Sequence, residues 1–306
     1  MFQYDFNVPE TKKIRLIIHT DCKNEADDQY ALAHHLMTPK FMVKGIIAAH
    51  FDKNVQEYGA GNTMDASFQE ILKMLDLMGL SGEYPVLKGA PVPMEHETDM
   101  IESEGADFII EEAMREDEHP LYIVCQGSVT DLACAILKKP EICGRMTAVW
   151  IGGGKWPEGC KEFNLKQDIP AANVVFKSDM PLWQVPIDVY KQVAVSLAEL
   201  QYKVKPCGKV GEYLFRQMVD YNNKFAWKLH WPQGETWGLG DQATVTVLLD
   251  ELERMNYDMM PAPEIREDMT YNHTGKYRPI RVYHTLDARM TMEDFYAKLA
   301  INFRDK

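Results

Sequence analysis

Short apolar runs alternate with longer amphipathic segments over the first 190 residues of the chain. Residues 14–18 (Ile-Arg-Leu-Ile-Ile) are an apolar run of strand length, rich in branched side chains. The segment 27–37 places Ala31, Leu32 and Leu36 at the spacing of one helix face. Such alternation predicts βαβ units and therefore a Rossmann-related α/β fold, with an open, mainly parallel sheet flanked by helices. The predicted strands are 14–19, 42–48, 121–125, 146–151 and 182–187, and the predicted helices are 27–37, 63–78, 99–115, 129–138, 170–177, 209–222, 241–253 and 292–302.

We expect a single domain over residues 1–306. The length permits one large α/β domain or two small ones, and the sequence contains no internal repeat, low-complexity tract or Pro/Ser-rich linker that would mark a boundary. Residues 223–240 are rich in aromatic side chains and glycine, which is typical of a functional loop leading into a helix. Residues 254–285 are polar and contain proline, and the pattern assigns no element to them.

Composition and charge exclude several classes of partner. Apolar residues make up 46% of the chain, enough for an ordinary globular core. The net charge of −13 argues against binding to the nucleic-acid backbone and to an anionic membrane surface, since both need Lys and Arg patches. The sequence has no apolar run of about 18 residues that could span a membrane, no visible signal peptide, and six cysteines without CxxC or zinc-ligand spacing. We therefore expect reduced thiols in a cytoplasmic protein.

Acidic residues crowd the carboxyl end of the first predicted strand. Asp21, Glu25, Asp27 and Asp28 lie between this strand and the following helix, at the edge where open α/β sheets bind ligands. Clustered carboxylates raise one another's pKa, so the arrangement is costly without a cation. A hard divalent metal prefers oxygen ligands of this kind. The structural alternative is a helix N-terminus whose acids favour the helix dipole, which would account for one or two of the four.

Polar segments also follow other predicted strands. Each has a structural alternative: an N-cap for Asp241, plain loop residues for His50 and Asp52, and a turn for Glu162 with Asn164. A Gly-Gly-Gly triplet could cradle a phosphate, but it lacks the Lys-Ser/Thr of a P-loop and the spaced glycines of a dinucleotide site. The segments are 50–54, 126–131, 152–168 and 240–241.

Taken in order, these segments resemble the calcium-dependent nucleoside hydrolases, the inosine-uridine-preferring ribohydrolase family. The resemblance is clear over about residues 12–252, and five motifs in the right order are far more specific than any one of them. The spacing between Asp21 and Asp27 is two residues longer than in the family motif, and it resembles the spacing in the branch called nucleoside-hydrolase-like. The matching segments are Asp21 with Asp27-Asp28, Gly127-Ser-Val-Thr-Asp-Leu-Ala133, Trp150-Ile-Gly-Gly-Gly154, Glu162-Phe-Asn164 with Asp168-Ile-Pro-Ala-Ala172, and Gly240-Asp241.

The chain also departs from the family pattern. His19 stands where the family has Asp, and Asp52 stands where it has a sugar-binding Asn. Gly240 replaces the imidazole that serves the family as leaving-group acid. An Asn expected some six residues before Glu162 is absent, in a loop that is shorter here. The resemblance therefore retains the metal and ribose ligands but leaves base recognition open.

The resemblance implies a metal-dependent hydrolase that cleaves the N-glycosidic bond of ribonucleosides. It implies a Ca²⁺ site made by Asp21, Asp28, Asp241 and the backbone carbonyl of Gln126, with Asp21 also acting as general base on the water that attacks C1′. Both roles agree with the oxygen-rich shell of Ca²⁺ and with general-base chemistry.

Further residues are expected to contact the substrate. Asp27, Glu162 and Asn164 are expected to hold the ribose hydroxyls, with Asp52 as a further candidate. Trp237 could stack on a purine, or it could simply pack a lid. Glu235 or His230 could supply the proton to the leaving base.

Three other functions are alternatives to nucleoside hydrolysis. A haloacid-dehalogenase-type phosphatase needs a second Asp two residues after the first, and Asp21 is followed by Cys22 and Lys23. A non-catalytic nucleoside or sugar binder would have no need of Asp21 as a base. A hydrolase of another glycoside is the third alternative. The expected ligand is a small nucleoside or related glycoside, and the expected assembly is a homodimer or homotetramer.

Overall fold

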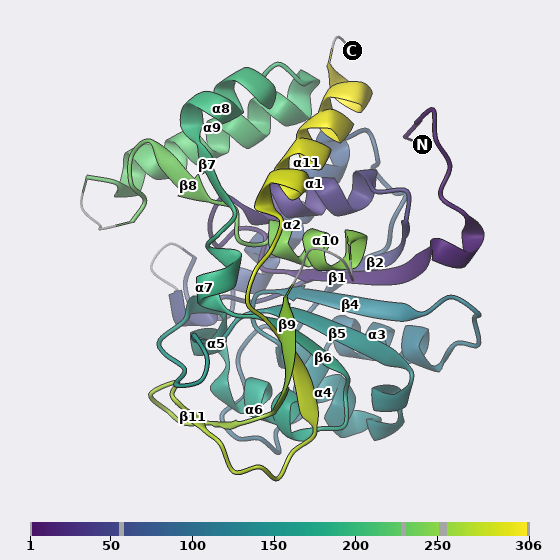
Figure 1. Cartoon of the computed structure of the whole chain (residues 1–306), viewed down its shortest axis with the longest axis vertical. Coiled ribbons are helices and arrows are strands. Elements are labelled where there is room, and N and C mark those ends of the chain that lie inside the picture. Colours follow the sequence, from purple (N-terminus) through teal and green to yellow (C-terminus); the bar gives the residue numbers. More distant parts are fainter. Residues whose placement is uncertain (1, 55–57, 228–230, 251–255, 305–306) are drawn as a thin grey trace.

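A computed structural model describes residues 2–54, 58–227, 231–250 and 256–304, and its centre is an eight-stranded sheet between two helical layers (Figure 1). The strand order is β3-β2-β1-β4-β5-β6-β12-β9, and every neighbouring pair is parallel except β12 and β9. The predicted open, mainly parallel α/β fold is therefore confirmed. The strands are β1 Ile14–Thr20, β2 Phe41–Ala48, β3 Val86–Lys88, β4 Leu121–Gln126, β5 Met146–Ile151, β6 Leu182–Val185, β9 Tyr257–Pro261 and β12 Pro279–Tyr283.

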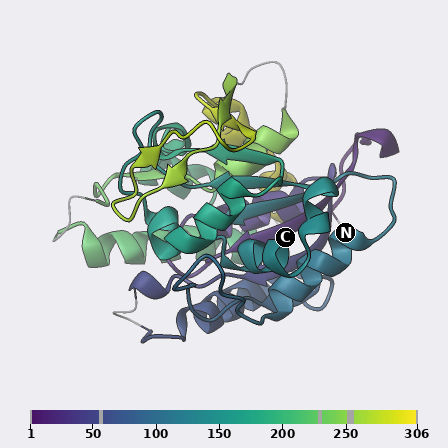
Figure 2. The same ribbon diagram turned by 90° about the horizontal axis from the view of Figure 1, so that it is seen from below.

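Helices cover both faces of the sheet, so its central strands are apolar on both sides. In β1, Leu16 and Ile18 belong to one core cluster and Ile17 belongs to the other. This explains why β1 has an unbroken apolar sequence instead of an alternating one. In Figure 1 one layer lies above the sheet and the other below it, and Figure 2 shows the lower layer in front. The upper layer contains α1 Asp28–Met37, α2 Thr63–Leu77, α9 Gly208–Phe225, α10 Gln242–Leu249 and α11 Ala288–Phe303; the lower contains α3 Glu104–Met114, α4 Thr130–Lys138 and α6 Ile169–Lys177.

The remaining elements are short and connect the layers. Helices α5 and α7 follow β5 and β6 at the carboxyl edge of the sheet, and α8 precedes α9. A small antiparallel pair, β7 and β8, brings residues near 195 and 237 together, and β10 pairs with β11. Their bounds are α5 Phe163–Gln167, α7 Ile187–Tyr190, α8 Leu197–Lys203, β7 Ala194–Ser196, β8 Thr236–Gly238, β10 Glu264–Ile265 and β11 Tyr271–Asn272.

Local chemistry explains where the predicted boundaries differ from the structure. The helix predicted over 99–115 begins at Glu104, because the Ser103 hydroxyl accepts a hydrogen bond from the backbone N–H of Ala106 and caps the helix. The strand predicted over 182–187 ends at Val185, because Pro186 turns the chain into α7. The prediction missed β3, and within the unassigned stretch 254–285 it missed β9 to β12. Strands this short, or bounded by proline, carry little periodicity.

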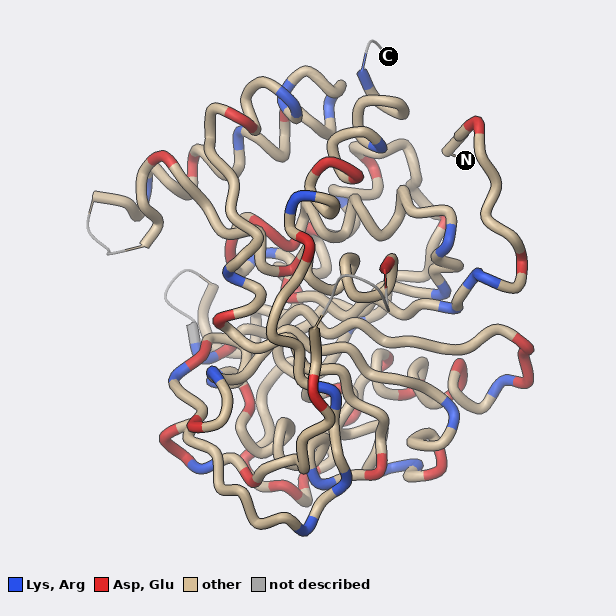
Figure 3. Tube along the Cα trace, viewed as in Figure 1, with Lys and Arg blue, Asp and Glu red and all other residues tan. Residues whose placement is uncertain are grey.

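Two properties expected from composition can be compared with the structure. The helices of the described residues include none that is long and apolar enough to cross a membrane. All six cysteines are free thiols, and five of them are buried. Figure 3 shows Lys and Arg positions scattered along the backbone trace among acidic ones.

The glycine triplet after β5 is explained by close packing. A Cβ atom on Gly152 would lie 2.2 Å from the Trp150 ring, and one on Gly154 would lie 1.9 Å from the backbone nitrogen of Cys160. Gly153 has a φ of +83°, in the left-handed region that favours glycine. The loop after β5 therefore folds back on itself through these residues, which places the following segment at the carboxyl edge of the sheet.

We predict that Gly154→Ala destabilises the protein, because its Cβ would meet backbone atoms that cannot rotate away. The expected loss in the free energy of unfolding is about 1–3 kcal/mol, measured by denaturant unfolding. Gly144→Ala is the matched control, since a Cβ at Gly144 meets no heavy atom within 4 Å. Equal stability of the two variants would contradict this explanation of the triplet.

Candidate active site

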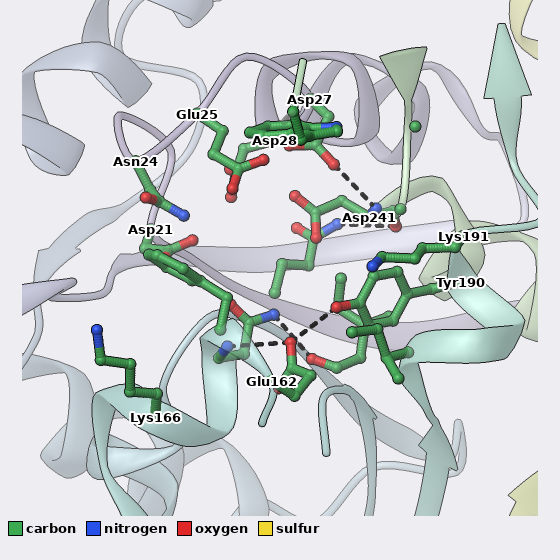
Figure 4. Close-up of a pocket in the computed structure, with 18 of the residues that line it drawn as sticks. Asp21, Asn24, Glu25, Asp27, Asp28, Glu162, Lys166, Tyr190, Lys191 and Asp241 are labelled. Carbon is green, nitrogen blue, oxygen red and sulfur yellow. Dashed lines mark hydrogen bonds between the residues drawn. The ribbon is translucent and has the colours of Figure 1, made fainter. Parts of the chain in front are cut away.

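A cavity of about 830 Å³ opens at the carboxyl ends of β1, β4, β5 and β6. Parallel strands bring these ends to one edge, so residues far apart in the sequence line the same space. Six carboxylates from three segments contribute to the lining, and Figure 4 shows them around its centre. They are Asp21, Glu25, Asp27 and Asp28 after β1, Glu162 after β5, and Asp241 before α10.

Three of these carboxylates are close enough to share a cation. Asp27, Asp28 and Asp241 each offer an oxygen atom, and these atoms all lie within 4.8 Å of one another. Asp21 is not one of these three residues, but it lines the same cavity, and the charge of Asp28 helps to raise its pKa. The Thr20 hydroxyl donates to Asp28 Oδ1 at 2.5 Å and fixes that carboxylate at the start of α1.

Two buried oxygen atoms beside the cluster have no hydrogen-bond partner among the described residues: Asp21 Oδ2 and Gln126 Oε1. The amide nitrogen of Gln126 donates to the backbone oxygen of Asp241 at 3.2 Å and to Thr244 Oγ1 at 3.0 Å. A buried polar atom without a partner costs free energy. A cation among these oxygens would supply the missing partner.

The electrostatics of the cluster favour bound protons or a bound cation. Burial raises the pKa of Asp27 to about 7 and that of Asp28 to about 6. Burial and the neighbouring carboxylates raise the pKa of Asp21, Glu25 and Asp241 well above the usual range. A divalent cation removes this cost, because its charge offsets the carboxylates once they have released their protons.

The local fold positions the cluster at two helix N-termini. Asp27 and Asp241 stand at the N-cap positions of α1 and α10, but neither side chain makes a capping hydrogen bond. Asp27 Oδ2 instead accepts a hydrogen bond from the backbone N–H of Asp241 at 3.5 Å, so the two side chains do not act as ordinary N-caps. Gly127 allows Asp21 to approach, since a Cβ at Gly127 would lie 2.8 Å from Asp21 Cγ.

Glu162 is held by the protein itself. Its carboxylate accepts hydrogen bonds from the backbone N–H groups of Gly153, Asn164 and Leu165 and, at 2.8 Å, from the Tyr190 hydroxyl. These four bonds use the acceptor capacity that a carboxylate normally has. Glu162 thus caps α5 and positions Tyr190 at the cavity wall. The expected direct contact between Glu162 and a ribose hydroxyl would have to replace one of these bonds.

Asn164 also lines the cavity. Its amide nitrogen donates to the backbone oxygen of Ile151 at 2.9 Å, which fixes the side chain between α5 and the end of β5.

The structure gives two expected substrate contacts other roles. Asp52 is not among the residues that line the cavity; its carboxylate accepts hydrogen bonds from Gly61 N at 2.7 Å and Thr63 Oγ1 at 3.4 Å, and so holds the turn before α2. Trp237 is only 2% exposed, because β8 turns it inward against Trp231 and Tyr221. Trp231, and not Trp237, lines the cavity.

The structure describes only one of the two residues considered as proton donors. Glu235 is exposed and is not among the residues that line the cavity, and His230 falls outside the described residues. The Tyr190 ring occupies the space that a side chain at position 240 would need, since a Cβ at Gly240 would lie 2.8 Å from Tyr190 Cδ2.

The cavity also contains side chains that the sequence did not single out. Asn24, Tyr190, Lys191 and Trp231 line it. Tyr190 and Lys191 follow β6, so the rule that ligands bind beyond the carboxyl ends of parallel strands would have found them. Trp231 reaches the cavity through a tertiary contact that no local pattern encodes.

Known proteins resemble this chain in fold and, more distantly, in sequence. The pyrimidine-specific ribonucleoside hydrolase RihA of Salmonella arizonae is 26% identical over 265 residues, which cover 76% of this chain and 79% of that protein. The purine-preferring ribonucleoside hydrolase from Gardnerella vaginalis superposes with a TM-score of 0.76 at 19% identity, covering 94% of this chain and 98% of that one. A plant nucleoside hydrolase, the PpNRh1 enzyme, superposes with a TM-score of 0.72 at 19% identity, over 94% of this chain and 98% of the other.

The match to a family model covers most of the chain. It spans residues 16–293, from β1 into α11, and includes every carboxylate of the cavity. The chain belongs to the inosine-uridine preferring nucleoside hydrolase family.

Proposed function

We propose that this cavity hydrolyses ribonucleosides with a Ca²⁺ ion held by Asp21, Asp28, Asp241 and the backbone carbonyl of Gln126, and with Asp21 as the general base. Membership of the family supports the type of reaction, which is hydrolysis of the N-glycosidic bond of ribonucleosides. The observation that supports the rest is the group Asp27, Asp28 and Asp241, whose oxygen atoms lie within 4.8 Å of one another. Asp21, which lines the same cavity, adds a buried Oδ2 without a partner among the described residues.

The donor set fits a hard divalent cation. All candidate ligands offer oxygen, and Ca²⁺ takes about six to eight oxygen ligands, from carboxylates, carbonyls and waters. When bound, the ion supplies positive charge that offsets the buried carboxylates and makes nearby water more acidic. Asp27 accepts one long hydrogen bond, from Asp241 N at 3.5 Å, and its remaining acceptor capacity can take one from a sugar hydroxyl.

Asp21 is the residue best placed to remove a proton from the attacking water. Its Oδ2 atom is buried without a partner among the described residues. Once a cation lowers its pKa, Asp21 is ionised and Oδ2 can accept a proton while the water attacks C1′. The glycosidic bond breaks through an oxocarbenium-like state, as in other glycoside hydrolysis. A protein that only binds nucleosides would not need this free oxygen.

We predict that Ca²⁺ stabilises the protein more at about pH 8 than at about pH 6. Because the pKa values of these carboxyl groups are raised in the fold, the metal-free folded protein binds more protons than the unfolded chain does. The stability that these protons contribute is present at low pH and is lost as pH rises through about 6 to 7, the pKa values of Asp28 and Asp27. Ca²⁺ replaces those protons, so its effect grows with pH. The measurement is the melting temperature with and without Ca²⁺ at both pH values.

Two variants control this calcium experiment. Asp28→Asn should fold, because it removes one repelling charge, but should lose the Ca²⁺ response. Asp188→Asn, an exposed residue of α7 outside the cavity lining, should keep the response. An unchanged Ca²⁺ response in Asp28→Asn would contradict the site.

We expect Asp21→Asn to lower ribose release from nucleosides by about 10²–10⁴-fold, the usual contribution of a general base. Ribose release in the presence of Ca²⁺ is the measurement, circular dichroism checks the fold, and Asp188→Asn again serves as the control. If Asp21→Asn kept most of the parent activity, another group would be the base. If the parent released no ribose from any nucleoside while still responding to Ca²⁺, the protein would be a binder.

The leaving group provides a separate prediction. Gly240 offers no side chain, and the Tyr190 hydroxyl is already directed to Glu162, so neither residue gives a free proton to a departing base. A nitrophenyl riboside needs no such proton and should therefore be cleaved about 10²–10⁴-fold faster than inosine or uridine. The comparison is of kcat/KM values for the three substrates. Equal values would mean that a group in the cavity protonates the base.

The homodimeric or homotetrameric state and the cytoplasmic location expected from the sequence stay predictions.

A further inference from the structure

Three lysines line the same cavity as the six carboxylates: Lys161, Lys166 and Lys191. They come from the segments that follow β5 and β6, and all three are exposed, whereas the carboxylates of Asp21 and Asp28 are buried. Figure 4 shows Lys166 and Lys191 on opposite sides of the view, with the carboxylates between them. The lysines therefore belong to the solvent end of the cavity and the carboxylates to its floor.

None of these three ammonium groups lies within 4.0 Å of a carboxylate oxygen of the described residues. Lys23, close to the acidic cluster in sequence, pairs with Glu70 at 3.1 Å. Elsewhere on the surface Lys138 pairs with Asp107 at 2.7 Å.

The lysines could simply offset the charge of the carboxylates. Ammonium groups with that role would be expected in contact with the acids, because both kinds of side chain line one cavity, but the contacts are absent among the described residues. Burial and the charges of Asp27 and Asp28 raise the pKa of Glu25. The positive charge of Lys191 lowers this pKa, but by less than each of those causes raises it. The ammonium groups are thus left available to a ligand that enters from solvent.

We propose that the substrate is an anionic ribonucleoside, carrying a phosphate or carboxylate group that Lys161, Lys166 and Lys191 bind while the carboxylate floor takes the sugar. The reaction itself rests on the proposed function. An anion would be repelled by the carboxylate floor unless cations met it at the entrance. Flexible ammonium groups suit this, since lysine binds phosphate as a compact point charge. The anion is on the sugar as a phosphate or on the base as a carboxylate.

Binding of reaction products tests the anion site without requiring catalysis. Calorimetry in the presence of Ca²⁺ compares ribose with ribose 5-phosphate, and uracil with orotate. We expect one anionic member to bind at least about tenfold more tightly than its neutral partner, since each exposed charge pair gives up to about fivefold. The preference should shrink as salt shortens the Debye length from about 30 Å to about 3 Å. Equal or weaker binding of both anions would overturn the proposal.

Variants assign the preference to these lysines. The triple variant K161Q/K166Q/K191Q should lose most of the ratio between anionic and neutral ligands. K155Q is the matched control, because Lys155 is an exposed lysine of the same loop that does not line the cavity, and it should keep the ratio. If the triple variant weakened neutral and anionic ligands equally, the lysines would serve charge balance and the proposal would fail.

Hydrolysis separates this proposal from the proposed function. The kcat/KM values of uridine, uridine 5′-monophosphate and orotidine are compared in the parent and in the two lysine variants. Faster cleavage of one anionic substrate, lost in the triple variant, is the expected result. A binding preference for an anion with no hydrolysis of any substrate would support the anion site and reject the hydrolase. Hydrolysis with uridine as the best substrate, and no preference for anions in binding, would support the hydrolase and reject the anion site.

Discussion

Repulsion among buried carboxylates is the constraint on which the site depends. Asp21, Asp27, Asp28 and Asp241 are each at least nine-tenths buried, and they lie at one edge of a parallel sheet. In low-dielectric surroundings such charges cannot all be ionised without a compensating cation. Two helix N-termini, those of α1 and α10, lower the cost without removing it. The fold is therefore built to hold positive charge at this point.

A hydrogen-bond chain behind the cluster makes that geometry rigid. The amide of Gln126 donates to Thr244 Oγ1, which lies 3.3 Å from His35 Nε2, and His35 Nδ1 lies 2.8 Å from the backbone oxygen of Ala31. Burial lowers the pKa of His35 to about 3, so the ring is neutral and can serve as both donor and acceptor. The end of β4 is thereby tied to α10 and α1, the helices that carry Asp241 and Asp28.

The site also requires neighbouring segments to pack closely around the cavity, and glycines make this possible. Gly127 makes room for Asp21, Gly240 makes room for the Tyr190 ring, and Gly154 lets the loop after β5 fold back toward the cavity. Through that loop Glu162 reaches both the N-terminus of α5 and the Tyr190 hydroxyl. The wall opposite the acidic cluster is thus fixed by backbone hydrogen bonds to one carboxylate, and the lysines at the entrance remain outside this network.

The sequence by itself determined the architecture and the position of the acidic site. Apolar periodicity located β1, β2, β4, β5 and β6, and because parallel strands end at a shared edge, the polar residues after them could be placed together. Only the tertiary structure decided which way individual side chains face. Trp237 turns into an aromatic cluster, Asp52 holds a turn, and Tyr190 fills the side of Gly240. These outcomes depend on contacts between distant segments, and the local alternation of polar and apolar residues carries no information about such contacts.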